Sequence, residues 1–247
     1  MNESELLIVV NDTKASGIKK NYYPELTTLI KRGALTILSY SEYEECRRTR
    51  SGLRILDKPL FNDEDVYMYN PYSRSYIKTT NQNLFMSFCV DKNIAVKEAL
   101  LRMGAKLIRI KVEYSDNNTI NISGKINGKI INTNADYNKL DVTKFITDIE
   151  CKASNRIPMK DLNLIRTYLL DHGLGNDTLL NSFCESLEGG RNLSGREEDF
   201  HITYLNEVDS ALEILSTIDS RYINASLDFT RNNNYIQQIT MELHVEF

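Results

Sequence analysis

The sequence predicts an α+β fold, in which an antiparallel sheet is built from two helix-strand-strand repeats with helices packed mainly on one face. Two observations lead to this prediction. First, an apolar stripe with helical spacing is followed by an alternating strand pattern, a pair of asparagines and a second alternating stretch. Second, the same order returns 115 positions later without a gap, so that Val96 corresponds to Ala211. The repeats cover about residues 94–130 and 209–247.

Each repeat contributes three elements to the prediction. Apolar residues at i, i+3, i+4 and i+7 indicate a helix, and strict alternation indicates a strand with one buried face. In the first repeat the helix, strand and return strand are predicted at residues 96–103, 108–114 and 120–130, and in the second at residues 211–218, 223–229 and 235–247. Two such ribbons pair into one sheet, because a lone ribbon is only marginally stable.

Residues 1–90 form an N-terminal α+β segment, either a domain of its own or extra strands of the same sheet. A short apolar run predicts a buried strand at residues 6–10, and Pro24 and Gly33 bracket a helix with ordinary start and stop signals. β-branched residues favour a strand within residues 34–40. Ser41 and Glu44 have the spacing of a capping box, which predicts a helix at about residues 42–49.

The next stretch predicts a hairpin and a further strand. Residues 66–69 and 75–78 flank a turn that contains Pro71, and residues 84–90 are apolar enough for a strand. Later, residues 145–153 are predicted as a strand. A helical insertion follows at about residues 158–190, with one helix that stops at Gly173 and another capped by Asp177.

Composition and charge narrow the functional classes. Of the residues, 41% are apolar and 26% charged, as in ordinary globular proteins, and the formal net charge of -4 gives no overall attraction for nucleic acid. The apolar runs are too short to span a bilayer, and no basic start with an apolar core resembles a signal peptide, so we expect a cytoplasmic protein. The cysteines are widely spaced, which predicts buried thiols and no cofactor.

Basic residues gather at the ends of two predicted helices. Cations in a last helical turn complement the helix dipole, which explains them without any ligand. If the two helix ends converge, the same residues form an anion or phosphate site. This candidate site consists of Lys31, Arg32, Arg47, Arg48, Arg50 and Arg54.

The residues closest to a catalytic pattern are Asp148, Glu150 and Lys152, which share one face of the strand predicted at residues 145–153. Two carboxylates and an amine can bind a divalent metal and position a water. The Glu-x-Lys spacing resembles the second half of the catalytic motif of restriction-endonuclease-like nucleases. That family has an Asp on a preceding strand, often after a proline, whereas Asp136 and Asp141 have no proline before them. The alternative is a solvated face of alternating charges.

The small number of histidines argues against most catalytic mechanisms that use histidine as an acid, a base or a member of a catalytic triad. The chain holds three, and none has a Ser or Cys partner in a recognisable motif. His244 is predicted on the polar face of the last strand. No metal site is predicted from these residues, so a divalent metal is expected only if the nuclease interpretation holds.

The leading interpretation is a non-enzymatic binding or self-assembly module that acts through protein contacts and sheet edges. A protein partner or a homo-oligomer is expected, nucleic acid has weaker support, and no membrane contact is expected in the resting state. Two alternatives are the metal-dependent nuclease with Asp148, Glu150 and Lys152, and a pore-forming protein. The pore uses the amphipathic strands at residues 120–130 and 235–247, which are long enough for membrane hairpins.

Overall fold

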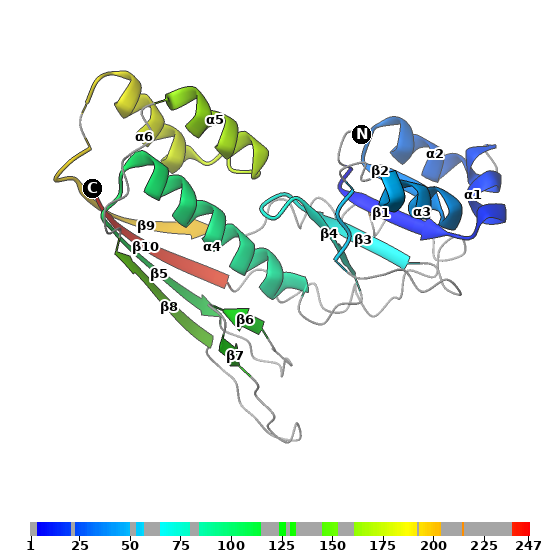
Figure 1. Cartoon of the computed structure of the whole chain (residues 1–247), viewed down its shortest axis with the longest axis horizontal. Helices are drawn as coiled ribbons and strands as arrows, with labels where there is room; N and C mark the ends of the chain where they lie inside the picture. The colour runs from blue at the N-terminus through cyan, green and yellow to red at the C-terminus, as the bar shows by residue number, and fades with distance from the viewer. Residues whose placement is uncertain are drawn as a thin grey trace. The chain divides into compact units, whose positions relative to one another are not determined.

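The computed structural model contains helices and sheets, which agrees with the α+β class (Figure 1). The structure describes residues 4–20, 23–49, 53–56, 65–79, 84–114, 124–126, 129–131, 145–152, 161–191, 193–203, 214 and 239–247. The chain divides into two compact units. The first comprises residues 1–70, 74–84 and 205–234, and the second comprises residues 71–73, 85–204 and 235–247. None of the described helices combines the length and apolar character needed to cross a bilayer.

Among the described residues, the first unit has a four-stranded mixed sheet and the helices α1, α2 and α3. Its strand order is β2-β1-β3-β4; β1 runs parallel to β2 and antiparallel to β3, and β3 and β4 pair antiparallel as the hairpin prediction requires. The elements are β1 (Leu6–Val10), α1 (Asp12–Lys19), α2 (Pro24–Lys31), β2 (Leu35–Ser39), α3 (Tyr40–Thr49), β3 (Asp65–Asn70) and β4 (Ser75–Lys78).

The central strand β1 is buried on both faces. Leu7 and Val9 pack in a cluster with Tyr43 of α3 and Tyr67 of β3. The residues between them, such as Ile8, are equally inaccessible. Helices α1 and α2 pack on the neighbouring strand β2 and bring their own buried apolar residues. A continuous apolar run is what a strand covered on both faces requires, and this explains the prediction made for residues 6–10.

Helix α2 confirms the predicted signals, and α1 was missed. Pro24 is the first residue of α2, and Gly33, just past its end, has φ +75°, a left-handed conformation that glycine adopts without strain. Helix α1 has little apolar periodicity, because only Ala15 and Ile18 are buried. Its signal is the cap: the side chain of Asn11 accepts a hydrogen bond from the Lys14 amide at 2.8 Å.

Helix α3 begins two residues earlier than predicted, because a different serine caps it. The Glu42 amide donates to Ser39 Oγ at 3.2 Å, and Glu42 Oε2 accepts from the Ser39 amide at 2.9 Å. This reciprocal pair is a capping box with the same spacing as the predicted one at Ser41 and Glu44. Ser41 instead binds Asp12 of α1, donating its amide to Oδ1 at 3.2 Å and its hydroxyl to Oδ2 at 2.6 Å.

The second unit contains a four-stranded antiparallel sheet of order β8-β5-β10-β9, together with a two-stranded ribbon of β6 and β7. Helices α4, α5 and α6 lie on one side of the larger sheet in Figure 1. The elements are α4 (Leu84–Met103), β5 (Leu107–Tyr114), β6 (Gly124–Ile126), β7 (Lys129–Ile131), β8 (Phe145–Lys152), α5 (Leu162–Asp171), α6 (Thr178–Glu188), β9 (Glu197–Thr203) and β10 (Ile239–Glu246).

Burial alternates along the two central strands of this sheet. In β5, Ile108 and Ile110 are buried and Arg109 is exposed, and in β10 Leu243 is buried while Glu242 is exposed. This is the period of a strand with one face on a core and one face toward water. At the end of β10, the ring of Phe247 contacts that of Phe183 in α6, with centroids 5.1 Å apart.

Two predicted strands are wrong. Residues 84–90 begin α4, where Leu84 and Phe88, four positions apart, are both buried. A short apolar run does not distinguish a strand from a buried helix, and no glycine or proline separates this run from the helix that was predicted after it. Residues 120–130 are not one strand, because β6 and β7 lie in this region and pair with each other, with Ile126 opposite Lys129.

The elements of the second repeat are described only in part. Strand β10 lies within the predicted return strand, residues 235–247, and pairs with β5. Of the helix and first strand predicted at residues 211–218 and 223–229, only Ile214 is among the described residues. The internal duplication therefore stays a prediction. Helices α5 and α6 occupy the predicted insertion, and Asp177 caps α6 by accepting from the Leu180 amide at 3.0 Å.

Candidate metal centre

The second sheet has a charged face on the side opposite its buried apolar residues, which we call the open face. Residues opposite one another in antiparallel strands lie on the same face. The register aligns His244 of β10 with Arg109 of β5 and Asp199 of β9, and aligns Glu246 with Glu197. The sheet register therefore brings three carboxylates and one imidazole together at the boundary of β9 and β10.

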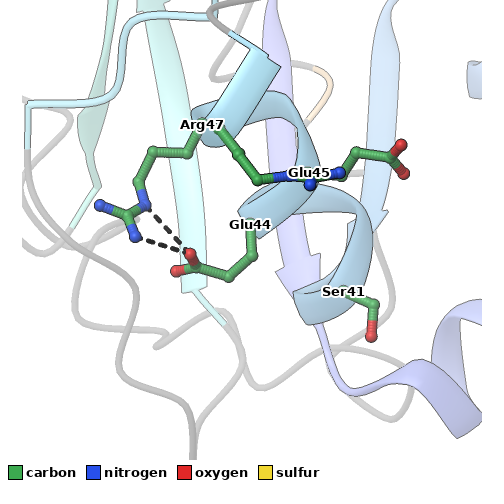
Figure 2. Close-up of a pocket in the computed structure, with 5 residues that line it drawn as sticks. Ser41, Glu44, Glu45 and Arg47 are labelled. Atoms are coloured by element: carbon green, nitrogen blue, oxygen red, sulfur yellow. Dashed lines mark hydrogen bonds and ion pairs between the residues drawn. The ribbon is translucent and has the colours of Figure 1, made fainter.

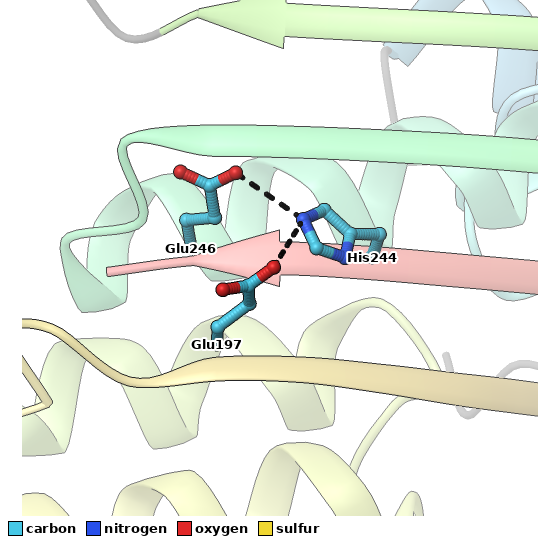
Figure 3. Close-up of side chains that lie close together, drawn as sticks. All are labelled: Glu197, His244 and Glu246. Atoms are coloured by element: carbon cyan, nitrogen blue, oxygen red, sulfur yellow. Dashed lines mark hydrogen bonds and ion pairs between the residues drawn. The ribbon is translucent and has the colours of Figure 1, made fainter.

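Glu197, His244 and Glu246 converge at this boundary (Figure 3). Nε2 of His244 lies 3.3 Å from Oε1 of Glu246 and 3.6 Å from Oε1 of Glu197. One ligand atom from each residue lies within 4.8 Å of the other two. His244 and Glu246 point to the same side because they are two positions apart on one strand, and Glu197 reaches them from the neighbouring strand.

Asp199 fixes the orientation of the imidazole. Its Oδ1 lies 2.7 Å from Nδ1 of His244. Because an ionised carboxylate only accepts hydrogen bonds, Nδ1 must donate, and the remaining nitrogen, Nε2, is left facing Glu197 and Glu246. The side chain of His244 is 20% exposed, whereas those of Glu197 and Asp199 are 67% and 85% exposed. The imidazole is therefore held in the sheet surface while two of its partners extend into solvent.

The surrounding carboxylates raise the pKa of His244 above its ordinary value. The hydrogen bond to Asp199 is the largest cause, the one to Glu246 comes next, and partial burial opposes both. A positive imidazolium thus satisfies the three carboxylates when a proton occupies Nε2. A cation of another kind at the same place satisfies them equally, because the imidazole nitrogen and carboxylate oxygens are metal ligands.

The predicted anion site is distributed over separate elements. Arg47 and Arg48 line a shallow hollow with Ser41, Glu44 and Glu45, all from α3 (Figure 2). Glu44 offsets the charge of Arg47: the guanidinium Nη2 lies 2.9 Å from its Oε2. An anion in this hollow would therefore meet two acidic side chains as well as two basic ones.

The other predicted cations that the structure describes do not line this hollow. Lys31 and Arg32 lie at the end of α2, and Arg54 lies in the segment at residues 53–56 that borders β4. Arg50 lies outside the described residues. Anion binding stays a prediction, because the described residues give it no shared pocket.

Asp148, Glu150 and Lys152 lie on β8, as predicted, at alternate positions of an edge strand. The register aligns Asp148 with Lys111 and Glu150 with Arg109 on β5. Each carboxylate-bearing residue therefore has a basic residue opposite it, which is the pattern of cross-strand charge pairing. The nuclease interpretation needs a further carboxylate beside Glu150, and the adjacent strand does not supply one at the aligned position.

Sequence reasoning missed the candidate metal centre because it missed β9. His244 was correctly predicted on a polar strand face, and Glu246 follows it at the spacing that shares this face. The first three residues of β9 are Glu197, Glu198 and Asp199, and this acidic run lacks apolar alternation. Nothing in the local sequence indicates that this segment pairs with a strand about forty residues further along the chain.

Two of the three cysteines whose side chains the structure describes fit the expectation of buried thiols. Cys89 and Cys184 are buried and Cys46 is partly exposed, and all three are free. Burial raises the pKa of the Cys89 thiol to about 12, which keeps it protonated and unreactive.

We also compared the chain with protein-family models, curated proteins and solved structures, and none of the three comparisons gave a match.

Proposed function

We propose that the protein is a non-enzymatic binding and self-assembly module, which makes its contacts through the edge of the second sheet. The observation that carries this proposal is strand β8, which has eight residues and ends the strand order β8-β5-β10-β9. In the described part of the chain, no strand pairs with the outer side of β8. An edge strand of this length presents a row of backbone donors and acceptors that another extended chain can pair with.

The other sheet edges are less suited to pairing. Strand β9 starts with Glu197, Glu198 and Asp199, whose charges repel a second copy of the same edge. Strand β2 has only five residues. The outer side of β4 already binds residues 53–56. The Tyr76 amide donates to the Arg54 carbonyl at 2.7 Å, and the Tyr76 carbonyl accepts from the Leu56 amide at 3.0 Å.

A second copy of this chain is the partner we propose for β8. Two identical edges related by a two-fold axis pair antiparallel, so the sheet continues across the interface and the backbone groups of both strands are satisfied. The sequence of β8 suits this role, because β-branched residues alternate with charges of both signs.

The test measures the oligomeric state of the wild-type chain and of a set of proline variants in β8. Sedimentation equilibrium of the full chain is expected to show a concentration-dependent dimer. Proline is then placed singly at Thr147, Asp148, Ile149 and Glu150. Successive residues of an edge strand direct their amides alternately outward and toward the neighbouring strand, and proline removes the amide. Alternate variants should therefore lose the dimer while keeping the fold, and the others should lose part of the fold.

Circular dichroism of each proline variant provides the control for folding. A chain that sediments as a monomer at every concentration overturns the self-assembly proposal. A dimer that survives all four prolines, each in a folded chain, places the contact somewhere other than β8 and overturns the proposed edge. Alternation of dimer loss with position supports strand pairing, whereas a side-chain interface predicts no such alternation.

A further inference from the structure

We infer that Glu197, His244 and Glu246 bind a divalent first-row transition metal ion, with Zn²⁺ as the preferred ion. This site lies on the open face of the second sheet and uses neither the outer edge of β8 nor any contact between chains. It therefore stands apart from the proposed function. The direction of the imidazole, the spacing of the ligand atoms and the backbone register all favour a metal ion here.

The direction of the imidazole separates this group from an ordinary cluster of acids. Nδ1 of His244 donates to Asp199, so Nε2 carries a lone pair when the ring is neutral. That lone pair faces carboxylate oxygens of Glu246 and Glu197. A proton on Nε2 allows it to donate to Glu246 at 3.3 Å; without that proton three acceptors are directed at one another, and a metal ion among them takes the proton's place. Metal-bound histidines usually donate their second N–H to a carboxylate, which is the role that Asp199 has here.

The spacing of the ligand atoms fits a tetrahedral ion. Zinc binds histidine nitrogen and carboxylate oxygen at about 2.0–2.2 Å, so two ligand atoms of a tetrahedral site lie about 3.3–3.6 Å apart. The distances from Nε2 of His244 are 3.3 Å to Glu246 and 3.6 Å to Glu197. The third distance, between the two carboxylates, is within 4.8 Å and closes by rotation of the exposed Glu197 side chain.

The backbone register holds the ligands in place. Glu197 and Glu246 are directly paired, and His244 is paired with Asp199; the two pairs lie on either side of the Val245–Glu198 pair, so all four residues are on the same face of the β9–β10 ladder. Arg109 on β5 is opposite His244 and contributes the positive charge of this row. The three carboxylates outnumber it, so a divalent cation is electrostatically favoured at this corner of the open face.

One nitrogen and two oxygen ligands select the class of metal. Imidazole favours zinc and its neighbours in the first transition row, whereas sites for Mg²⁺ and Ca²⁺ use oxygen ligands alone. A tetrahedral ion has four coordination positions. Three protein ligands therefore leave one position open for water or for a group of another molecule. The binding site thus has the ligand number of an accessible zinc centre and not that of a closed structural one.

Isothermal titration of the full chain, freed of metal by a chelator, with Zn²⁺ tests the inference. We expect saturable binding of one ion per chain. Glu197→Gln, Glu246→Gln and His244→Gln should each weaken this binding at least about tenfold, and Asp199→Asn, which alters the orienting group, about 10–100-fold. Co²⁺ in place of Zn²⁺ should give a spectrum without thiolate-to-cobalt charge transfer, which excludes the cysteines as ligands.

Two neighbours provide matched controls. Glu198→Gln changes the adjacent residue of β9, whose side chain pairs with Arg196, and Glu242→Gln changes a residue on the same face of β10. Both should leave the affinity unchanged. Absence of saturable Zn²⁺ binding, or equal loss in the site and control variants, overturns the inference and leaves a proton as the only cation of this cluster. If His244→Gln unfolds, Glu197→Gln still decides, because that side chain is 67% exposed.

Discussion

The two sheets of this protein differ in how many of their faces are covered. Leu7, Ile8 and Val9 of β1 are all fully buried, so every residue of that strand has to be apolar. In β10, buried Leu243 follows exposed Glu242, and only every second residue is constrained by the core. A strand covered on both faces by apolar side chains, as β1 is, leaves no positions for polar chemistry. A sheet with an open face leaves half of its positions available to polar residues. The candidate metal centre uses two of these positions on β10, His244 and Glu246, and one on β9, Glu197.

The ion pairs of the two sheets follow the same division. In the first sheet, Lys78 pairs with Asp65, whose side chain is only 2% exposed. In the second sheet, Nζ of Lys111 lies 3.3 Å from Oε2 of Glu242, and both side chains are 40% exposed or more. The first pair is part of a core, and the second is a surface pair of the kind that contributes little to stability.

Removal of the buried carboxylate should have the largest effect. Asp65→Ala leaves the poorly exposed ammonium of Lys78 without its carboxylate, and we expect it to lower the free energy of unfolding by about 3–5 kcal/mol. Urea denaturation followed by circular dichroism measures this change. A loss below about 1 kcal/mol would mean that the pair is solvated and that the two sheets do not differ in this respect.

Truncation of consecutive residues in β1 should be costly at every position. Leu7→Ala and Ile8→Ala each remove a fully buried side chain, one from either face of the sheet, and each should cost about 2–5 kcal/mol in urea denaturation. If one of these two substitutions is nearly neutral, that face of β1 is not packed as described, and the contrast with β10 disappears.

The stability of the first unit should also depend on pH, through the carboxylate of Asp12. Hydrogen bonds from the hydroxyl and the amide of Ser41 lower the pKa of Asp12, so its ionised form stabilises the fold above the unfolded pKa of 3.8. This contribution is lost as the pH falls through the lower, folded pKa. Unfolding temperatures of the wild type and Ser41→Ala should therefore differ at neutral pH and converge in acid. A difference that does not change with pH contradicts the role given to Asp12.

The smallest effect is expected on the open face of the second sheet. Glu242→Ala removes a half-exposed partner of Lys111 and should change the free energy of unfolding by no more than about 0.5 kcal/mol. Leu243→Ala, one residue further along β10, should cost about 2–5 kcal/mol, because that side chain is buried. Equal costs at the two positions would show that the open face is covered.

Local signals in the sequence predicted the elements whose ends are set by single residues. Pro24 and Gly33 bracket α2, and Asp177 caps α6, because a cap acts within one turn of its own helix. The capping box of α3 was misplaced by two residues, because Ser39 and Ser41 both have a glutamate three positions later. The structure decides for Ser39, since Asp12 already binds the other serine.

The other errors of the prediction concern which strand segments pair with each other. The register pairs Ile126 with Lys129 across the sequence Asn127-Gly128, a typical signal for a two-residue hairpin loop that the longer alternating pattern obscured. The candidate metal centre is a similar case, because it depends on β9 lying beside β10. Periodicity correctly predicted that His244 lies on a polar face, but it does not identify the strand that supplies Glu197.

The link between Asp12 and Ser41 also bears on what the first unit can bind. In sheets with parallel strands, ligands such as nucleotides bind at the carboxyl ends of the strands, where helix amides attract phosphate. Here β1 and β2 end at Val10 and Ser39, and the first turn of α3 follows directly. The carboxylate of Asp12 already holds the Ser41 amide at that place. The chain thus supplies its own anion at the Ser41 amide, and a phosphate ligand would have to displace Asp12 to reach this amide.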